Sequence, residues 1–367
     1  MKYILIIVLM SAHFMGDSDN AKSVSNALQA QFSESKNVKT VEIMVRAKEE
    51  QEINKEDLLK AINKDTNYDE IIVIGAGLDG IKAIDIINNQ NNPKFKFIWS
   101  GHQLIKEVED SLEKLNIVIL PEYAASEDKK AGIRKQVKLI ETLGVPHSTK
   151  KEDIIQAAKK WLDEDKIDKA DKYLVVCLGG KVPSDQDGEH NYPATEALKL
   201  GKHLAKIAKT QKMVLLATDG PRSGREVREA FLKGVNSILS DSANPLNTYI
   251  KDKFKFIAYD DSAGSSVNPF LGLALLTKGS IAIIGGDSAS LVTKAVNLLP
   301  GQVYIEENSA MTAIHKKQIG ILIKNGEAKT LKYTDGGLVP YNILVDEIPN
   351  DAETAAKEIV KYEQKLN

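Results

Sequence analysis

Three polar turns in the C-terminal half of the sequence combine glycine, hydroxyl and basic residues in a pattern that suits a phosphate. Each turn follows a short apolar run and precedes a stretch with helical periodicity. Glycine allows a backbone amide to approach an anion closely, and the unpaired amides at a helix start attract negative charge. An arginine adds two parallel donors for phosphate oxygens. The residues expected to hold such a ligand are Gly179, Gly180, Lys181, Thr218, Arg222, Gly286, Asp287, Ser288 and Ser290.

The same turns also admit a purely structural interpretation. In "LLATDGPRSGREV", Pro221 would start a helix that Asp219 or Ser223 caps, and "IGGDSASLV" would be a tight strand-to-helix turn. One turn of this kind is common. Three of them at the ends of predicted strands in one half of the chain favour a ligand that carries phosphate.

A fourth polar segment, "SAHFMGDSDN", follows the first apolar run of the chain. Asp17 or His13 in this segment is a candidate general base, because a carboxylate or an imidazole can accept a proton from a substrate hydroxyl. The alternative is structural: Asp19 or Asn20 caps the next helix, and His13 is an ordinary surface residue.

Several other classes of site have little support in the sequence. "GAGLDG" has the spacing G-x-G-x-x-G, but it follows the third apolar run and not the first, so we interpret it as a tight turn and not as an NAD site. The six histidines show no paired spacing and no acidic segment resembles a calcium loop, so no metal site is expected. The single cysteine, Cys177, lies in an apolar run and is expected to be a buried thiol.

Composition limits the partners of the protein. The chain has 367 residues, with 49 Lys and Arg against 51 Asp and Glu, so it lacks the excess positive charge that a nucleic-acid partner would favour. No apolar run is long enough for an integral membrane segment. The start, "MKYILIIVLM", suits a signal peptide or a buried parallel strand, and we interpret it as a strand. We expect a soluble, cytoplasmic protein, whose oligomeric state the sequence does not define.

Short β-branched runs alternate with helical stretches along the whole chain, which predicts βαβ units and parallel sheets. In the first half the predicted strands are 3–10, 41–45, 70–75, 94–99 and 116–120, with helices at 20–32, at 55–63 and from 77 onward. In the second half the predicted strands are 172–178, 212–218, 254–259, 280–285 and 302–306, with helices at 195–209, 223–233 and 288–298. Ser148 or Thr149 is expected to cap a helix between the halves, and 351–367 is expected to be a terminal helix.

The predicted fold class is α/β, with two Rossmann-like doubly wound domains that face a cleft. The expected divisions are an N-terminal domain over 1–148, a C-terminal domain over 149–345 and a terminal segment over 346–367. Ligands of doubly wound sheets bind outside the carboxyl ends of the strands, so the polar turns described above are expected to line the cleft.

The segment "NPFLGLALLTKGSIAIIGGDSASLVTKAV", residues 268–296, resembles part of the "elongated mitochondria" fission-protein family: Asn-Pro-aromatic-Leu-Gly, an apolar strand, then Gly-Asp-Ser-x-Ser. Further family marks occur in the same order in "DEIIVIGAGLDGIKAI", "VILPEY", "LGVPHSTKKEDI" and "VVCLGGK", so the resemblance spans roughly residues 15–306. Bacterial members of this family are regarded as nucleotide-sugar enzymes with a glycosyltransferase-B-like fold. The sequence departs from the family in three places: "TDGPR" replaces its Thr-Ser-Arg-Arg-Thr turn, Lys294 replaces its usual glutamate, and the first loop, "GDSDNAKS", lacks the glycines typical there.

The resemblance implies a glycosyltransferase that takes a nucleotide diphosphate sugar in the C-terminal domain and an unknown acceptor in the N-terminal domain. The polar turns and Asn268 would hold the donor, Asp17 or His13 would remove the acceptor proton, and no further cofactor would be required. The resemblance also implies that the terminal helix packs back on the N-terminal domain. A nucleotide-sugar epimerase is a second interpretation, since the same fold serves both reactions. A non-catalytic binding or adaptor protein is a third, which Lys294 permits.

Overall fold

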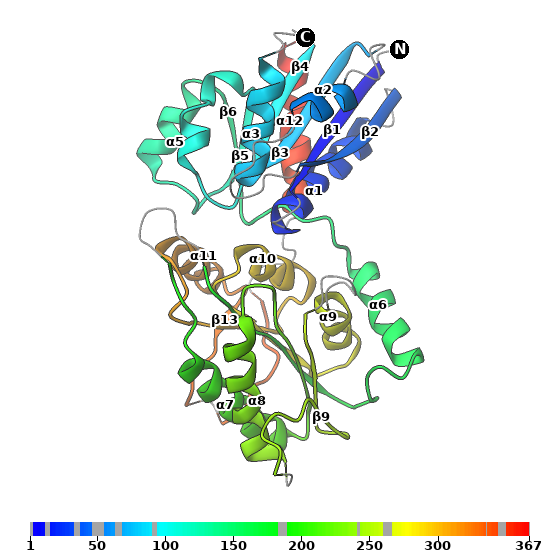
Figure 1. Cartoon of the computed structure of the whole chain (residues 1–367), viewed down its shortest axis with the longest axis vertical. Coiled ribbons are helices and arrows are strands. Elements are labelled where there is room, and N and C mark those ends of the chain that lie inside the picture. The colour runs from blue at the N-terminus through cyan, green and yellow to red at the C-terminus, as the bar shows by residue number, and fades with distance from the viewer. Residues whose placement is uncertain are drawn as a thin grey trace. The chain divides into compact units, whose positions relative to one another are not determined.

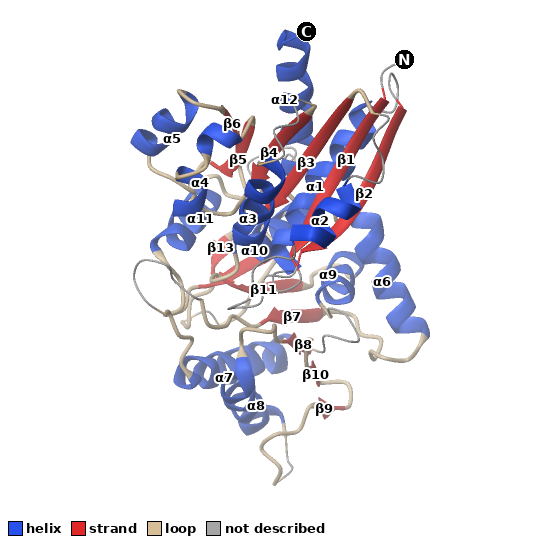
Figure 2. Ribbon diagram, turned by 45° about the horizontal axis from the view of Figure 1, so that its top comes forward, coloured by secondary structure: helices blue, strands red, loops and turns tan. Residues whose placement is uncertain are grey.

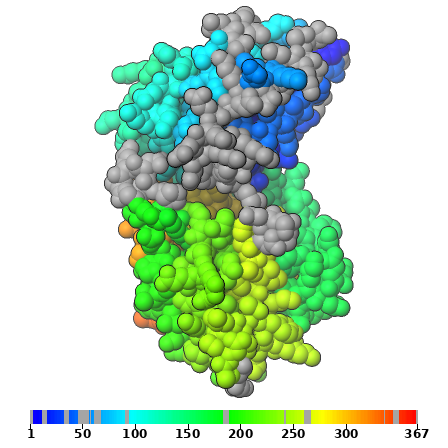
Figure 3. Space-filling view, in the orientation of Figure 1, coloured from blue at the N-terminus to red at the C-terminus, as the bar shows by residue number. Residues whose placement is uncertain are grey.

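The computed structural model divides into two compact units, residues 1–148 with 349–367 and residues 149–348 (Figure 1). Each unit has its own sheet and its own hydrophobic core. The structure describes residues 3–11, 15–32, 37–45, 55–62, 68–89, 94–182, 189–240, 243–259, 266–334, 336–343 and 350–366. The other segments are grey in the space-filling view (Figure 3).

The N-terminal unit is built on a parallel sheet with the strand order β2-β1-β3-β4-β5-β6. Its strands are β1 (Tyr3–Ser11), β2 (Asn37–Val45), β3 (Glu70–Ala76), β4 (Phe95–Ser100), β5 (Ile117–Pro121) and β6 (Lys138–Thr142). Its helices are α1 (Met15–Phe32), α2 (Lys55–Ile62), α3 (Gly77–Asn88), α4 (Lys106–Glu109), the 3-10 helix η1 (Leu112–Lys114), α5 (Glu127–Arg134) and α12 (Asp351–Leu366). The strand order reverses at β1, because β2 pairs with one side of β1 and β3 pairs with the other.

The side chains of β1 explain why helices cover both faces of this sheet (Figure 2). Ile4, Ile6 and Val8 pack in one core cluster with residues of α1 and α12. Leu5 and Ile7 point to the opposite face, where they pack with residues of α2 and α3. A strand that is buried on both faces has a continuous apolar sequence. The interpretation of the start of the chain as a core strand is therefore confirmed.

The terminal helix α12 packs beside α1 as part of the N-terminal unit. Ile359 is fully buried in the cluster under α1. Near the start of α12, the carboxylate of Asp351 accepts a hydrogen bond from the backbone N–H of Leu143 at 2.9 Å. Near its end, the buried Glu363 pairs with Lys96 on β4. The helix is thus fixed at both ends by buried carboxylates.

The C-terminal unit has a second sheet, with the order β13-β12-β11-β7-β8-β10-β9. Its strands are β7 (Tyr173–Cys177), β8 (Val214–Thr218), β9 (Tyr249–Ile250), β10 (Phe254–Ile257), β11 (Ile281–Gly285), β12 (Val303–Glu306) and β13 (Lys329–Thr330). Its helices are α6 (Lys151–Asp163), α7 (Ala194–Gln211), α8 (Gly224–Leu239), α9 (Val267–Leu276), α10 (Ala289–Leu298) and α11 (Ala313–Lys324). Only the edge pair of β9 and β10 is antiparallel among the described strand pairs.

This second sheet is also covered on both faces. Leu174 and Val176 of β7 pack with α7 and α8, whereas Val175 and Cys177 pack with α6, α9, α10 and α11. Cys177 is a buried free thiol, as predicted, and burial raises its pKa to about 12. The alternation of apolar runs and helices in the sequence therefore corresponds to two parallel sheets, and the α/β fold class is confirmed.

Several elements depart from the usual patterns and were not predicted from the sequence. β6 is a short strand with charged residues at two of its five positions, so it lacks a clear apolar run. α9 has no polar face, because it is buried among other helices, and its periodicity is therefore weak. α5 and α11 were also not predicted.

The predicted cap of the helix between the halves is wrong. α6 begins at Lys151, after Ser148 and Thr149, and Lys150 is its N-cap residue. The backbone N–H of Lys150 donates to the carboxylate of Asp153 at 2.8 Å, so an acidic side chain in the first turn closes the helix start. None of the helices in the described ranges is both long and apolar enough to cross a membrane.

Candidate functional site

The C-terminal sheet reverses its strand order between β7 and β11. From β7 the chain adds β8 and β10 on one side and later adds β11, β12 and β13 on the other. In doubly wound sheets, ligands bind outside the carboxyl ends of the strands at such a reversal. The turn after β7 contains Gly179, Gly180 and Lys181, and the turn after β11 contains Gly286 and Asp287. Two of the three polar turns predicted from the sequence thus lie side by side at this point.

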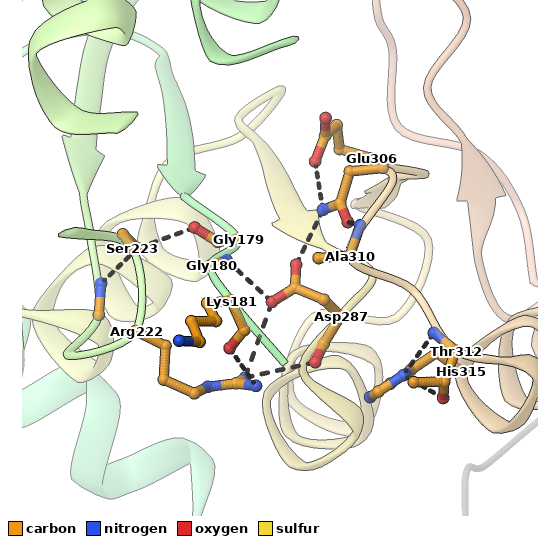
Figure 4. Close-up of polar contacts among 12 residues, drawn as sticks. Gly179, Gly180, Lys181, Arg222, Ser223, Asp287, Glu306, Ala310, Thr312 and His315 are labelled. Carbon is orange, nitrogen blue, oxygen red and sulfur yellow. Dashed lines mark hydrogen bonds and ion pairs between the residues drawn. The ribbon is translucent and has the colours of Figure 1, made fainter. Parts of the chain in front are cut away.

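Glycines allow these turns to approach one another closely. A Cβ atom on Gly179 would lie 2.1 Å from an oxygen of Asp287, and one on Gly285 would lie 2.6 Å from the Cα of Gly179. A Cβ atom on Gly180 would lie 2.4 Å from the backbone carbon of Arg222, which belongs to the third turn. The three turns therefore meet around Gly179 and Gly180 (Figure 4).

The guanidinium of Arg222 bridges the other two turns. Its Nη1 donates to the carbonyl of Lys181 at 3.3 Å, and its Nη2 donates to the carbonyl of Asp287 at 3.3 Å. The carboxylate of Asp287 lies 3.7 Å from the same Nη2. These contacts use only part of the five N–H donors of an arginine. Because the side chain is 40% exposed, a ligand can reach the remaining donors.

The carboxylate of Asp287 points away from the helix that follows it. It accepts hydrogen bonds from the backbone N–H of Gly180 at 2.9 Å and from the amide of Asn308 at 2.8 Å, and the residue is 1% exposed. Ser288 is the N-cap residue of α10 but its side chain makes no cap, and Ser290 lies half-buried in the first turn. The first amides of α10 are thus left uncapped by the described side chains, although the sequence places three candidate caps beside them.

The expected capping of the helix after the third turn by Asp219 or Ser223 is wrong. Ser223 is the N-cap residue of α8 but does not cap it; its hydroxyl donates to the carbonyl of Gly179 at 2.8 Å and accepts from the N–H of Gly220. Asp219 binds the guanidinium of Arg228 at 2.6 Å, so it is not a cap either. Both residues fix the shape of the turn that carries Arg222.

Among the described contacts, the side chains of three predicted residues take no part in this cluster, although the backbone of Lys181 does. Thr218 is buried and its hydroxyl donates to a neighbouring carbonyl. Lys181 is exposed and pairs with Glu189. Asn268 lies on α9, and no hydrogen bond or ion pair joins it to the three turns within the described residues. Lys294 lies on α10, where its charge partly offsets the effect of burial on the Cys177 thiol.

A buried carboxyl at the end of β12 extends the site and was missed by the sequence analysis. Glu306 accepts hydrogen bonds from the amide of Asn308 at 2.9 Å and from the hydroxyl of Tyr192 at 3.1 Å. Burial, the charge of Asp287 and that of Glu196 raise the pKa of Glu306 to about 7. The sequence does mark Glu306 as a candidate site residue, because the predicted strand "QVYIE" ends in this glutamate just as other predicted strands end in polar turns.

The N-terminal unit has a second polar cluster where its sheet reverses between β1 and β3. Asp17 lies in the first turn of α1, and burial together with the charge of Asp79 raises its pKa to about 7. Its carboxylate lies 4.0 Å from Nδ1 of His102. Gly77 leaves the space that Asp17 occupies, since a Cβ there would lie 2.0 Å from an Asp17 oxygen. His13 falls outside the described residues.

Asp79 is the second carboxyl of this cluster. It is 4% exposed, lies in the first turn of α3 and accepts a hydrogen bond from the hydroxyl of Ser11 at 2.7 Å. "GAGLDG" forms the tight turn that the sequence predicts, with Gly75 packed against Gly80. The prediction that Asp19 or Asn20 caps α1 is wrong, because the helix begins at Met15 and both residues lie inside it.

Two solved structures that resemble this chain are UDP-GlcNAc 2-epimerases. The enzyme from Neisseria meningitidis, bound to UDP-GlcNAc, has 12% sequence identity and a TM-score of 0.51, with 100% of both chains covered. The enzyme from Methanocaldococcus jannaschii has 10% identity and a TM-score of 0.57, again with 100% of both chains covered. At such low identity the likeness shows the fold alone, which is the glycosyltransferase-B-like fold.

A comparison with curated proteins found no match. The sequence model of the family described as "Mitochondrial fission ELM1" matches residues 16–361, which is nearly the whole chain. The match includes the three polar turns of the C-terminal unit and the acidic cluster of the N-terminal unit, and it confirms the resemblance seen in the sequence. The chain therefore belongs to the Mitochondrial fission ELM1 family.

Proposed function

We propose that the C-terminal unit binds the diphosphate of a nucleotide-activated sugar and that the protein transfers the sugar to an acceptor. The observation that carries this proposal is the uncapped start of α10 beside the guanidinium of Arg222. Free helix amides and an arginine together form a strong anion site. Both would also stabilise the negative charge that develops on the diphosphate as the sugar leaves.

The N-terminal unit would supply the acid–base group in this reaction. Asp17 has a pKa of about 7, so near neutral pH it is present in both protonation states. A carboxylate in this range is a suitable general base for the hydroxyl of a sugar acceptor. The negative charge of Asp79 contributes to the raised pKa of Asp17, because it opposes ionisation of the Asp17 carboxyl.

Binding of nucleoside diphosphates to the full chain tests the donor site. Arg222→Ala is expected to weaken the affinity for the preferred nucleoside diphosphate by about 10- to 100-fold, the value of a charge-assisted hydrogen bond or two. Arg225→Ala is the matched control, because Arg225 lies three residues away on α8, is 88% exposed and pairs with Glu229. Equal affinity in the wild type and in Arg222→Ala, or a panel of diphosphates without any binding, would remove this site and favour an adaptor.

An epimerase is a second candidate, and the pair of carboxyls Asp17 and Asp79 favours it. A protonated and an ionised carboxyl side by side can remove a proton from a sugar carbon and return one. Incubation of a nucleotide sugar without an acceptor separates the two reactions. Formation of the epimer under these conditions supports the epimerase, whereas diphosphate release that requires an added acceptor supports transfer.

A further inference from the structure

We propose that Asn308 is a positioning residue that holds the Asp287 carboxylate away from the start of α10. This inference rests on the proposed function, because it explains how the anion site stays open for the ligand. No motif in the sequence marks Asn308, which follows β12 in the loop before α11.

An aspartate just before a helix tends to bind the amides of that helix. Its carboxylate can accept a hydrogen bond from the amide two residues further along, which for Asp287 is the amide of Ala289, the first residue of α10. The positive end of the helix dipole attracts the same carboxylate. An Asp287 side chain in that position would occupy the amides that a phosphate needs, and it would add a negative charge beside them.

The structure shows the carboxylate in the opposite position (Figure 4). One oxygen accepts from the N–H of Gly180 at 2.9 Å, and the other accepts from the side-chain amide of Asn308 at 2.8 Å. Of these two donors, only Asn308 is a side chain and can be removed without a change in the backbone. Gly179 makes room for the pair, since a Cβ there would lie 2.1 Å from Asp287 and 2.7 Å from Asn308.

Asn308 is itself fixed on three sides. Its amide nitrogen donates both to Asp287 and to Glu306, the latter at 2.9 Å. Its amide oxygen accepts from the backbone N–H of Ala310 at 3.0 Å. The residue is 8% exposed and Glu306 is 2% exposed, so water does not compete for these bonds. The amide therefore has one orientation, and it presents a donor to Asp287.

Removal of this donor gives two measurable consequences. In Asn308→Ala, the free oxygen of Asp287 is expected to turn to the amide of Ala289. Hydrogen exchange at the first amides of α10, measured without ligand, should then slow by about 5-fold, as a new hydrogen bond of about 1 kcal/mol would produce. Affinity for UDP and ADP should fall by about 10-fold, because the carboxylate and the phosphates compete for the same amides.

The double variant Asp287→Ala/Asn308→Ala separates positioning from a general loss of structure. Without the carboxylate nothing competes for α10, so Asn308→Ala should have no further effect on exchange or affinity in the Asp287→Ala background. Asn325→Ala is the control, because it removes a comparable Asn–Glu hydrogen bond, to Glu327 at 3.2 Å, in the same unit. It should change neither measurement.

The two measurements fail in different ways. If the wild type binds no nucleoside diphosphate, the proposed function fails, while hydrogen exchange still tests whether Asn308 holds Asp287. If the wild type binds but Asn308→Ala leaves both exchange and affinity unchanged, the positioning role is wrong. An equal loss of affinity for Asn308→Ala with and without Asp287 would also overturn it, since that result indicates a structural effect.

Discussion

The two units have the same kind of sheet, and each has a pair of carboxyls at or just after the ends of two neighbouring strands. In the N-terminal unit the pair is Asp17 and Asp79; in the C-terminal unit it is Glu306 and Asp287. In each pair one member has a pKa raised to about 7, and burial is the largest cause in both. The second member adds to the shift through its negative charge.

The surroundings of the two pairs differ in the donors that they offer. Asp287 is held by a backbone amide and the Asn308 side chain, with Arg222 at 3.7 Å. Asp79 accepts a hydrogen bond from the hydroxyl of Ser11, and the basic group near Asp17 among the described residues is the imidazole of His102. A fixed cation and free helix amides suit an anionic ligand, whereas a carboxyl without a fixed cation suits proton transfer. Under the proposed function, the same fold would support two kinds of chemistry through a few side chains near the ends of neighbouring strands.

The largest expected effect comes from removal of the proton acceptor in the N-terminal unit. Asp17→Asn should lower turnover with a nucleotide sugar and acceptor by about 10²- to 10⁴-fold, the usual contribution of a general base. Affinity for the nucleoside diphosphate should stay unchanged, because the proposed donor site lies in the C-terminal unit. Asp19→Asn, an exposed aspartate on the same helix, is the control. Parallel loss of turnover and of diphosphate affinity would contradict the division of roles.

The raised pKa of Asp17 also predicts how stability depends on pH. The Asp17 carboxyl keeps its proton up to about pH 7 in the folded state but only up to about pH 3.8 in the unfolded state. Its contribution to the free energy of unfolding is therefore fully present below pH 3.8 and is lost as the pH rises to about 7. Each pH unit is worth about 1.4 kcal/mol, which gives a loss of up to about 4 kcal/mol. Asp17→Asn should remove this loss and be the more stable form at pH 8 in urea unfolding. Equal slopes in both proteins would show that Asp17 ionises normally.

The corresponding effect in the C-terminal unit should be smaller. The pKa of Glu306 rises from 4.5 to about 7, so the stability lost as pH rises between these values is up to about 3 kcal/mol. Glu306→Gln should remove that loss and keep the hydrogen bond to Asn308, because an amide oxygen can accept it. The measurement is again urea unfolding from pH 4.5 to pH 8. If Glu306→Gln changes the pH dependence of unfolding free energy more than Asp17→Asn does, the expected order of the two units is wrong.

Several parts of the site could be predicted because they depend on local sequence. Glycine, serine and arginine after an apolar run mark the carboxyl end of a parallel strand, and the turns with Gly179, Arg222 and Asp287 all follow this rule. Asp17 was found by the same rule after the first strand. Glu306 also lies at the end of an apolar run. It was overlooked because its turn, "EENSAM", contains no glycine.

Other features depend on contacts between distant segments. Capping of α8 by Asp219 or Ser223 was a reasonable local alternative, yet Asp219 binds Arg228 and Ser223 binds Gly179. α9 could not be predicted as a helix by its periodicity, because it is mostly buried and its sequence has no polar face.

The sequence by itself determined the alternation of strands and helices, the family, and the residues placed at the strand ends. These follow from hydrophobic periodicity and local turn chemistry, which act over a few neighbouring residues. Only the tertiary structure decided which of those residues interact: that burial and the charge of Asp79 raise the pKa of Asp17, and that Asn308 binds the carboxylate of Asp287. The physical reason is that burial and charge interactions depend on distance in space, and strand order brings together residues that the sequence keeps far apart.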